Sequence, residues 1–204
     1  MIAVVDYGGG NLGSLTGALE RFGVGFALTD EPAAVDLADA VILPGDGAFG
    51  ATMEALRARG LDDAVRRAIA AGRPFLGICV GMQILFEGSD EYGEHRGFGV
   101  FPGTVTRLSG APRVPHMGWD TLDVVGAHPC IEGVRTGDYV YFLHSYAAPV
   151  VADTVASCTY GRPFSAVVAR GRVVGTQFHP EKSQQTGLRI LSNFLRSIDA
   201  GARA

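Results

Sequence analysis

One stretch in the middle of the chain decides the fold: Arg73-Pro74-Phe75-Leu76-Gly77-Ile78-Cys79-Val80-Gly81-Met82-Gln83-Ile84-Leu85-Phe86-Glu87. The apolar run 75–78, introduced by a proline, is typical of a short strand, and the run 80–86 suits a buried or half-buried helix. Between them, the pattern Gly-x-Cys-x-Gly has the spacing of a nucleophile elbow, in which a strand turns at once into a helix. The glycines leave the room that such a turn needs, so the stretch predicts an outward-pointing cysteine.

Cys79 has two competing interpretations at this position. A cysteine at a helix N-terminus lies at the positive end of the helix dipole, which favours the thiolate. The backbone N–H of Val80 is unpaired at a helix start and can donate to an oxyanion. Free cysteines, however, are usually buried and act as small hydrophobes. The two flanking glycines favour the functional interpretation, which requires a base elsewhere in the chain.

Length and composition fit a compact enzyme. The 204 residues suit one domain over 1–204, with 47% hydrophobic residues and a net charge of −4. No long Lys/Arg run or membrane-length apolar run occurs, which argues against nucleic-acid and membrane partners. The first six residues predict a strand, not a signal peptide. The three widely spaced cysteines, at 79, 130 and 158, indicate a reducing, cytoplasmic setting without disulfides, a zinc site or another cofactor.

The order of elements predicts an α/β fold. Early segments alternate between strand and helix, which indicates a mostly parallel sheet. The expected strands are 2–6, 24–29, 40–43 and 75–78, and the expected helices are 12–22, 52–59 and 61–71. After about Asp90 the segments are short strands separated by turns, so antiparallel additions are expected. These are 100–108, 139–144, 154–160, 165–170 and 172–177, followed by an amphipathic helix at 188–198 and a frayed tail at 201–204.

A glycine loop near the N-terminus offers an alternative function. Gly8-x-Gly10-x-x-Gly13 follows a strand and opens a helix, and Asp30 lies after the second strand. This is the context of a dinucleotide-binding fingerprint, so a nucleotide-binding module is one hypothesis. The simpler interpretation is a tight turn that needs positive φ. We favour the turn, because the second half of the chain does not continue as a doubly wound dinucleotide domain.

A candidate base lies in the segment Gln177-Phe178-His179-Pro180-Glu181-Lys182. The proline disfavours a helical conformation for His179, and residues two apart in an extended segment point the same way. His179 and Glu181 are therefore expected to project together, and a carboxylate beside an imidazole selects its tautomer and supports the imidazolium. A surface turn with a solvated pair is the simpler alternative. Together with an elbow cysteine, the pair completes a nucleophile, a base and an orienting acid.

Pro44-Gly45-Asp46-Gly47 follows a predicted strand, at the strand end where open α/β sheets bind ligands. If this strand neighbours the Cys79 strand, its backbone can present a second N–H to an oxyanion; an ordinary turn is the alternative. The other histidines lack the spacing to a carboxylate, and His144, at the end of an apolar strand, is interpreted as a satisfied core or rim residue. These others are His95, His116, His128 and His144.

Taken together, these motifs resemble the class I, triad-type glutamine amidotransferases. Within that class the chain is similar to the glutaminase subunits of imidazole glycerol phosphate synthase, an enzyme of histidine biosynthesis. The resemblance covers essentially the whole chain in order. It rests on the cysteine and His-Pro-Glu motifs and on Asp6-Tyr7-Gly8 with Asn11-Leu12, Pro44-Gly45-x-Gly47-Ala48-Phe49, His116-Met117-Gly118-Trp119 and Tyr141-Phe142-Leu143-His144-Ser145-Tyr146.

The resemblance implies a three-layer fold and a role for each matching residue. Cys79 attacks the amide of glutamine, His179 transfers the proton to the departing ammonia, and Glu181 orients His179. The remaining residues divide into an oxyanion hole, a substrate site and a subunit contact: Val80, Gly45, Asp46 and Gly47; Gln83, Ser145 and Tyr146; and Trp119, Tyr141 and Lys182. The implied partner is a (β/α)₈-barrel cyclase subunit in a heterodimer, which receives the ammonia and converts PRFAR into imidazole glycerol phosphate and AICAR.

Asp46 departs from the family pattern, which commonly has an apolar residue, often valine, at this position. A carboxylate facing a developing oxyanion would be harmful, so we expect Asp46 to point to solvent. Because free ammonia would be lost to water, we expect low glutaminase activity without the partner, through an incomplete oxyanion hole in the 45–47 loop. The alternatives are the glutaminase subunit of pyridoxal phosphate synthase, a cysteine peptidase or esterase, and a pure interaction protein.

Overall fold

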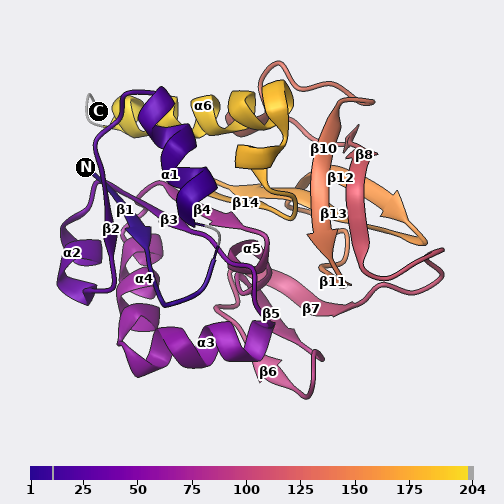
Figure 1. Ribbon diagram of the computed structural model, residues 1–204, viewed down its shortest axis with the longest axis horizontal. Helices are drawn as coiled ribbons and strands as arrows, with labels where there is room; N and C mark the ends of the chain where they lie inside the picture. Colours follow the sequence, from indigo (N-terminus) through magenta and orange to yellow (C-terminus); the bar gives the residue numbers. More distant parts are fainter. Residues whose placement is uncertain (11, 202–204) are drawn as a thin grey trace.

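The protein has an eight-stranded mixed sheet at its centre (Figure 1). The computed structural model describes residues 1–10 and 12–201. The strand order is β2-β1-β3-β4-β14-β13-β12-β9, parallel from β2 to β14 and antiparallel beyond. The strands are β1 (Ile2–Val5), β2 (Phe26–Thr29), β3 (Ala40–Leu43), β4 (Phe75–Ile78), β9 (Asp123–Val124), β12 (Thr154–Tyr160), β13 (Arg162–Arg170) and β14 (Val173–Thr176). The predicted parallel sheet with antiparallel additions is confirmed.

Helices cover both faces of this sheet. Figure 1 shows α1 and α6 on one side and α3 and α4 on the other, which makes three layers. The helices are α1 (Leu12–Arg21), α2 (Pro32–Leu37), α3 (Phe49–Ala58), α4 (Leu61–Ala70), α5 (Val80–Gln83) and α6 (Gln184–Gly201), with 3-10 turns η1 (Pro129–Ile131) and η2 (Pro180–Lys182). Within the described residues, no helix has both the length and the apolar character that crossing a membrane requires.

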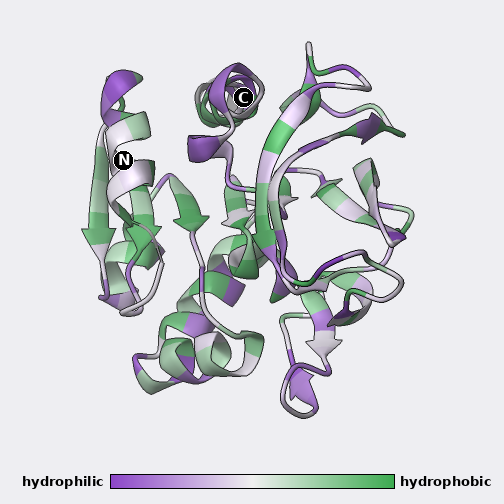
Figure 2. Cartoon of the chain, turned by 45° about the vertical axis from the view of Figure 1, so that its right-hand side comes forward, coloured by the Kyte–Doolittle hydropathy of each residue, from purple (hydrophilic) through white to green (hydrophobic). Residues whose placement is uncertain are grey.

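The central strands form because their side chains are buried on both faces. Every residue of β1, β3, β4 and β14 is buried, as expected for parallel strands between two helical layers. Figure 2 shows the corresponding hydrophobic residues running along the strands near the N-terminus. The ends of these strands therefore lie on a rigid base, and the loops that follow them are positioned by it.

Two smaller sheets lie beside the main one. An antiparallel pair joins β8 (His116–Thr121) to β10 (Tyr139–His144), and a four-stranded sheet has the order β11-β7-β5-β6. Its strands are β5 (Phe86–Ser89), β6 (His95–Arg96), β7 (Phe101–Arg107) and β11 (Tyr146–Ala147). On β8 and β10, alternate side chains face the protein interior and the exterior, so one face of this pair is exposed.

The helix expected over 80–86 was predicted too long. The helix α5 ends at Gln83, and Phe86 begins a strand that pairs in parallel with β7. The carbonyl of Leu85 accepts hydrogen bonds from the N–H groups of Val100 and Phe101, so pairing with a distant segment replaces the next helical turn. The helix α2 and the short strands β5, β6, β8, β9 and β11 were not predicted from the sequence. Beyond Gly201, which is the last residue of α6, the predicted fraying of the tail lies outside the described residues.

Two glycines in helices, Gly81 in α5 and Gly17 in α1, allow a matched test of stability. A Cβ on Gly81 would overlap the carbonyl oxygen of Leu43, whereas a Cβ on Gly17 in α1 would meet nothing within 4 Å. We expect Gly81→Ala to lower the free energy of unfolding by about 3 kcal/mol. Gly17→Ala should raise it by about 0.5–1 kcal/mol, because alanine is the better helix former. Urea denaturation of both variants checks this, and equal effects would contradict the packing at Gly81.

Candidate active site

Cys79 has the backbone geometry of a nucleophile elbow. It follows β4 directly, precedes α5, and has φ 55° and ψ −110°, a left-handed value that is strained for a non-glycine residue. A Cβ on Gly77 would overlap the carbonyl of Gly81, so the two glycines allow the close approach of strand and helix. The backbone N–H of Cys79 donates to the carbonyl of Thr176 on β14 at 2.7 Å, which fixes the turn to the neighbouring strand.

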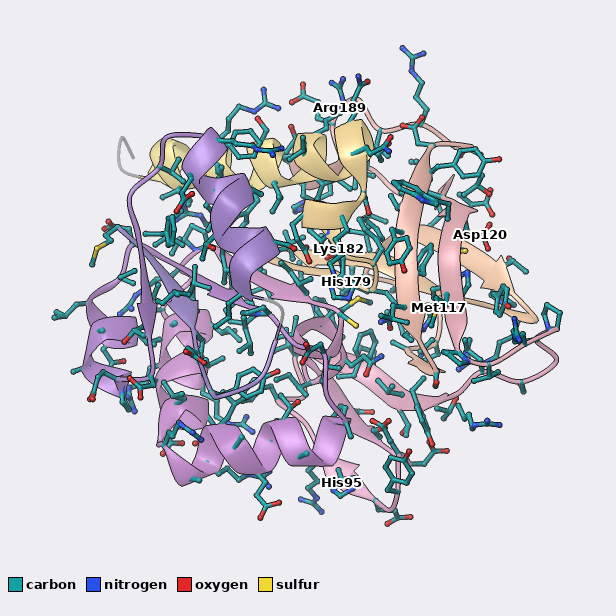
Figure 3. All side chains as sticks on the ribbon, in the orientation of Figure 1. His95, Met117, Asp120, His179, Lys182 and Arg189 are labelled. Carbon is teal, nitrogen blue, oxygen red and sulfur yellow. The ribbon has the colours of Figure 1, made fainter. Side chains whose placement is uncertain are left out.

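The candidate base and its orienting acid lie together as the sequence indicated. His179 is extended, with φ −91° and ψ 100°, and Pro180 begins the turn η2. The Nδ1 of His179 lies 2.9 Å from Oε1 of Glu181, and both side chains are nearly fully buried. In Figure 3, His179 and Lys182 lie next to helix α6 near the centre of the molecule, and the strand β8, which carries Met117 and Asp120, lies to their right. The pair is therefore an internal one, not a solvated surface turn.

The surroundings of His179 favour its protonated form. Burial alone would lower the pKa, but hydrogen bonds to Cys79 and Glu181 and the charges of the same two groups outweigh it. Together they raise the pKa of His179 from 6.5 to about 10. An imidazolium held between a thiol and a carboxylate can keep the sulfur ionised and can later deliver its proton to a leaving group.

The sulfur of Cys79 has two further contacts that were not predicted from the sequence. Its S–H donates to the carbonyl of Leu143 at 3.9 Å, and the side-chain amide of Gln177 donates to it at 3.7 Å. Gln177 directly follows β14, whose last residue, Thr176, is in register with Ile78 of β4. Parallel pairing of the two strands could have indicated that Gln177 lies beside Cys79, but the sequence alone does not give that pairing.

A pocket of about 330 Å³ opens at the sulfur. It contains six of the residues expected at the oxyanion hole and the substrate site, namely Asp46, Gly47, Val80, Gln83, Ser145 and Tyr146. Its other lining residues were not anticipated as site residues: Ala48, Glu91, Tyr92, Pro115, Leu143 and His144. Among these, Glu91 adds a carboxylate, whose Oε2 accepts the backbone N–H of Phe49 at 2.7 Å. The pocket thus combines a nucleophile, backbone amides and the carboxylates of Asp46 and Glu91.

The 45–47 loop is packed tightly against the elbow. Gly45 is buried, and a Cβ there would come within 2.9 Å of both the Gly81 nitrogen and the Val80 Cβ, so only glycine fits. Asp46 is exposed, as expected, but it does not simply face solvent. Its Oδ1 accepts a hydrogen bond from the backbone N–H of Gly10 at 2.8 Å. The carboxylate is thus held by the neighbouring glycine loop.

That contact bears on the alternative interpretation of the glycine loop. Gly8 and Gly10 have φ values of +89° and +101°, which the tight-turn interpretation requires. The Gly10 N–H, one of the groups that would face a pyrophosphate, is already bonded to Asp46. Asn11, part of the family resemblance, lies outside the described residues. The loop therefore serves as a turn that supports the 45–47 segment.

Two of the three residues expected at a subunit contact, Trp119 and Tyr141, lie on one exposed surface. Trp119 on β8 and Tyr141 on β10 are cross-strand neighbours whose rings meet edge to face, 6.0 Å apart at 71°. The backbone N–H of Tyr141 donates to the hydroxyl of Ser183, which itself donates to the carbonyl of His179 at 2.6 Å. Lys182 lines a separate cavity of about 400 Å³ together with Glu181. The surface is thus connected to the candidate base through two hydrogen bonds.

His144 is the satisfied core residue that its position in an apolar strand suggested. Its Nδ1 lies 2.9 Å from the carbonyl of Tyr146, and its Nε2 lies 3.2 Å from Nδ1 of His116. Burial lowers the pKa of His144 to about 3, so this imidazole is neutral near pH 7. Burial likewise lowers the pKa of His116, which stacks on Tyr160 and Phe142. The two imidazoles are cross-strand neighbours on β8 and β10, and His144 also lines the pocket.

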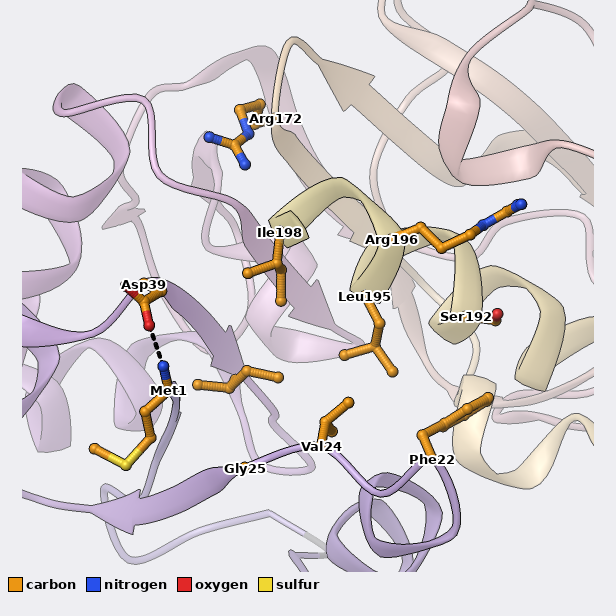
Figure 4. A pocket seen from close by; sticks show the side chains of 11 residues that line it. Met1, Phe22, Val24, Gly25, Asp39, Arg172, Ser192, Leu195, Arg196 and Ile198 are labelled. Atoms are coloured by element: carbon orange, nitrogen blue, oxygen red, sulfur yellow. Dashed lines mark hydrogen bonds and ion pairs between the residues drawn. The ribbon is translucent and has the colours of Figure 1, made fainter. Parts of the chain in front are cut away.

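Two further features of the described residues differ from the site at Cys79. Burial raises the pKa of Cys130 to about 12 and also raises that of Cys158, so both thiols stay protonated. The cavity in Figure 4, about 540 Å³, has the ion-paired N-terminus and Asp39 among its lining groups, together with Phe22, Val24 and Leu195, and no described cysteine or histidine lines it. Among the residues described, no cluster of His, Cys, Asp and Glu could hold a metal ion.

Comparison with known proteins identifies the class. The family model described as "Glutamine amidotransferase class-I" matches residues 3–198. A solved structure titled "Crystal structure of glutamine amidotransferase" superposes with a TM-score of 0.76 at 22% identity, covering 98% of this chain and 100% of that chain. At this level of identity the structural likeness supports the fold alone. The matched family and the fold define a class I glutamine amidotransferase.

Two curated relatives identify the family within this class. The "Imidazole glycerol phosphate synthase subunit HisH" of Syntrophotalea carbinolica is 47% identical over 203 residues, covering 95% of this chain and 98% of the relative. The protein of the same name from Symbiobacterium thermophilum is 47% identical over 199 residues, covering 97% and 94%. The chain belongs to this family of HisH subunits, as the resemblance in its motifs predicted.

The raised pKa of His179 predicts a pH-dependent contribution to stability. Because the folded-state pKa of about 10 exceeds the ordinary 6.5, the stabilisation is complete below about pH 6.5 and is lost as the pH rises through about 10. Glu181→Gln should therefore cost about 1–2 kcal/mol of unfolding free energy near pH 6.5, and this cost should fade toward pH 10. Denaturant unfolding across this range checks it. A cost that is constant or grows with pH would contradict the buried ion pair.

Proposed function

We propose that the chain, acting over residues 1–204 as one glutaminase domain, hydrolyses glutamine to glutamate and ammonia. We further propose that it passes the ammonia to a cyclase subunit, which makes imidazole glycerol phosphate and AICAR from PRFAR. The single observation that carries the proposal is the elbow at Cys79 with the buried His179–Glu181 pair beside it, in a chain of the HisH family. Three free cysteines support a reducing, cytoplasmic setting.

The reaction uses Cys79 as the nucleophile and His179 as the acid and base. The sulfur attacks the side-chain amide carbon of glutamine and forms a tetrahedral oxyanion. His179, protonated through its contacts with Cys79 and Glu181, gives its proton to the amide nitrogen, and the C–N bond breaks to release ammonia. The thioester that remains is attacked by water, with His179 now accepting a proton. Glutamate leaves and the thiolate–imidazolium pair is restored.

The oxyanion is assigned to backbone N–H groups at the pocket floor. Val80 begins α5 and lines the pocket, so its N–H lies at a helix start, where a developing negative charge is favoured. The second donor comes from the loop of Gly45, Asp46 and Gly47, which packs on Val80. Removal of one such donor costs about 10²–10³ in rate. We expect this loop to be incompletely oriented in the absence of a partner, and the activity of the chain alone to be low for that reason.

The substrate site is assigned to residues that line the same pocket. Ser145 directly follows the last residue of β10 and Tyr146 begins β11, and both line the pocket at Cys79. The amide nitrogen of Gln83 is used within the protein, donating to the Tyr146 carbonyl at 2.8 Å and to Oε1 of Gln177 at 3.0 Å. Any contact of Gln83 with glutamine must then use its amide oxygen. The carboxylate of Glu91 is a suitable acceptor for the α-ammonium group of the substrate.

The partner is expected to bind the exposed face of β8 and β10. This face carries five large side chains on two neighbouring strands: Met117, Trp119, Tyr139, Tyr141 and Leu143. Met117 is 62% exposed and Tyr139 is 59% exposed, although both are apolar or aromatic. Such a patch on a subunit of a synthase is typical of an interface. Leu143 also lines the catalytic pocket, so a partner bound here would cover the site where ammonia is released.

The activity is tested by measuring glutamate release from glutamine, with the chain alone and with a cyclase subunit and PRFAR. We expect the rate to rise about 10²-fold or more on mixing, because the second oxyanion donor becomes available. Cys79→Ala should abolish release under both conditions. Strong activity that is indifferent to the cyclase would overturn the proposed coupling. No release under either condition would overturn the glutaminase assignment.

The docking face is tested with Trp119→Ala. Exposed aromatic anchors are commonly binding hot spots, so we expect the affinity for the cyclase to fall by about 2 kcal/mol, roughly thirtyfold in Kd. Leu37→Ala is a suitable control, because Leu37 is 87% exposed but lies at the end of α2, far from β8 in Figure 1. Isothermal titration of both variants with the cyclase subunit separates the two surfaces. If Trp119→Ala and Leu37→Ala bind the cyclase subunit with equal affinity, the partner contact does not lie on the β8–β10 face.

A further inference from the structure

The side chain of Gln177 occupies a position that the triad description leaves unexplained. It is fully buried and lies between Gln83 and the nucleophile. Its Oε1 accepts a hydrogen bond from Nε2 of Gln83 at 3.0 Å, and its Nε2 donates to Sγ of Cys79 at 3.7 Å. A buried amide with partners on both sides is fixed in place, since losing either partner would leave a polar group unsatisfied.

The chain of contacts determines which end of the Gln177 amide faces the sulfur. The carbonyl of Tyr146 can only accept, so the Gln83 atom 2.8 Å from it must be the amide nitrogen. That same nitrogen donates to Gln177, and the Gln177 atom facing Gln83 is therefore its oxygen. The NH₂ group is left pointing at Cys79. The orientation thus follows from a backbone carbonyl and needs no further assumption.

The sheet brings the two residues together. Cys79 and Gln177 each follow the last residue of a strand, and the strands β4 and β14 pair in parallel with Ile78 opposite Thr176. The Cys79 N–H donates to the Thr176 carbonyl, and the Gln177 N–H donates to the carbonyl of Ala166. Both backbones are therefore held where the side chains leave the sheet. This places the Gln177 amide at a fixed distance from the sulfur.

The two contacts of the sulfur favour opposite protonation states. The carbonyl of Leu143 accepts from the S–H and so stabilises the neutral thiol, whereas it repels a thiolate. The N–H of Gln177 gains strength when the sulfur becomes negative, because hydrogen bonds to charged groups are the stronger ones. On ionisation the sulfur therefore exchanges the attraction of Leu143 for that of Gln177. The imidazolium of His179 supplies the positive charge that stabilises the thiolate, and the hydrogen bond from the Gln177 amide fixes the position of the sulfur.

We propose that Gln177 is a positioning residue for the nucleophile, whose amide N–H stabilises the Cys79 thiolate and holds it in place for attack. The inference concerns how the proposed glutaminase reaction is set up, and so rests on the proposed function. It also gives Gln83 a second role, because Gln83 fixes the orientation of Gln177. The sulfur is thus linked through two amides to the Tyr146 carbonyl at the edge of the substrate pocket.

The test uses two substitutions of Gln177 and one control. Gln177→Glu keeps the size and the oxygen that faces Gln83, but it places an oxygen where the N–H was. Gln177→Met removes both hydrogen bonds and keeps the volume. Thr176→Val is the control: this neighbouring hydroxyl is buried without a hydrogen-bond partner, so its removal should leave the sulfur unaffected. Thermal unfolding establishes whether each variant is folded. If Gln177→Met does not fold, Gln177→Glu alone tests the proposal.

The first measurement is the rate at which iodoacetamide alkylates Cys79, followed by peptide mass spectrometry. Because only the thiolate reacts, both Gln177 variants should react about tenfold more slowly than the wild type near neutral pH and equally fast at alkaline pH. Thr176→Val should match the wild type throughout. A Gln177 variant that is folded and reacts like the wild type at neutral pH overturns the proposal. A decrease in the alkylation rate that is the same at every pH also overturns the proposal.

The second measurement is cyclase-stimulated glutaminase kinetics. A positioning residue acts on the attack step, so kcat should fall about tenfold or more while KM stays within about twofold. A rise in KM with kcat unchanged would assign Gln177 to substrate binding and overturn the proposal. If the wild type releases no glutamate, the proposed function fails. The alkylation profile, which needs no substrate, still decides whether the amide stabilises the thiolate.

Discussion

The close approach of three backbone segments at Cys79 is the constraint on which the rest of the structure depends. Gly81 packs on the carbonyl of Leu43, and Gly77 packs on Gly81, so β3, β4 and α5 meet without any side chain between them. The turn forces a positive φ on Cys79 and points its sulfur into the pocket. The neighbouring strands β3 and β4 are buried on both faces. Their tight packing keeps Cys79 in this strained backbone conformation.

The second half of the chain completes the site from the other side of the same sheet edge. The strand β14 pairs with β4 and delivers Gln177 and His179 next to the sulfur. Two hydrogen bonds through Ser183 then connect His179 to β10, whose outer face carries the exposed aromatic residues. Catalytic geometry and the proposed partner surface are therefore parts of one hydrogen-bonded unit. Through these hydrogen bonds, a partner bound at the proposed surface can affect the position of His179.

Much of this could be predicted from local sequence, and the remainder needed long-range pairing. The elbow follows from Gly77-x-Cys79-x-Gly81, because glycine spacing encodes close approach, and the His179–Glu181 contact follows from the fixed conformation around Pro180. The helix expected at 80–86 was too long because β7, distant in sequence, pairs with Phe86. Gln177 and the contact between Asp46 and Gly10 were missed for the same reason: each depends on which segments lie side by side.

The central claim is that glutamine is cleaved through a covalent bond to Cys79 and not to another thiol. The most direct measurement is acid quenching of the chain during turnover of ¹³C-labelled glutamine with the cyclase subunit, followed by mass spectrometry of the cysteine peptides. The account predicts a labelled γ-glutamyl thioester on the peptide of Cys79 and none on those of Cys130 and Cys158, whose buried thiols stay protonated. Label on either of those cysteines, or glutamate release without any adduct on Cys79, would contradict it.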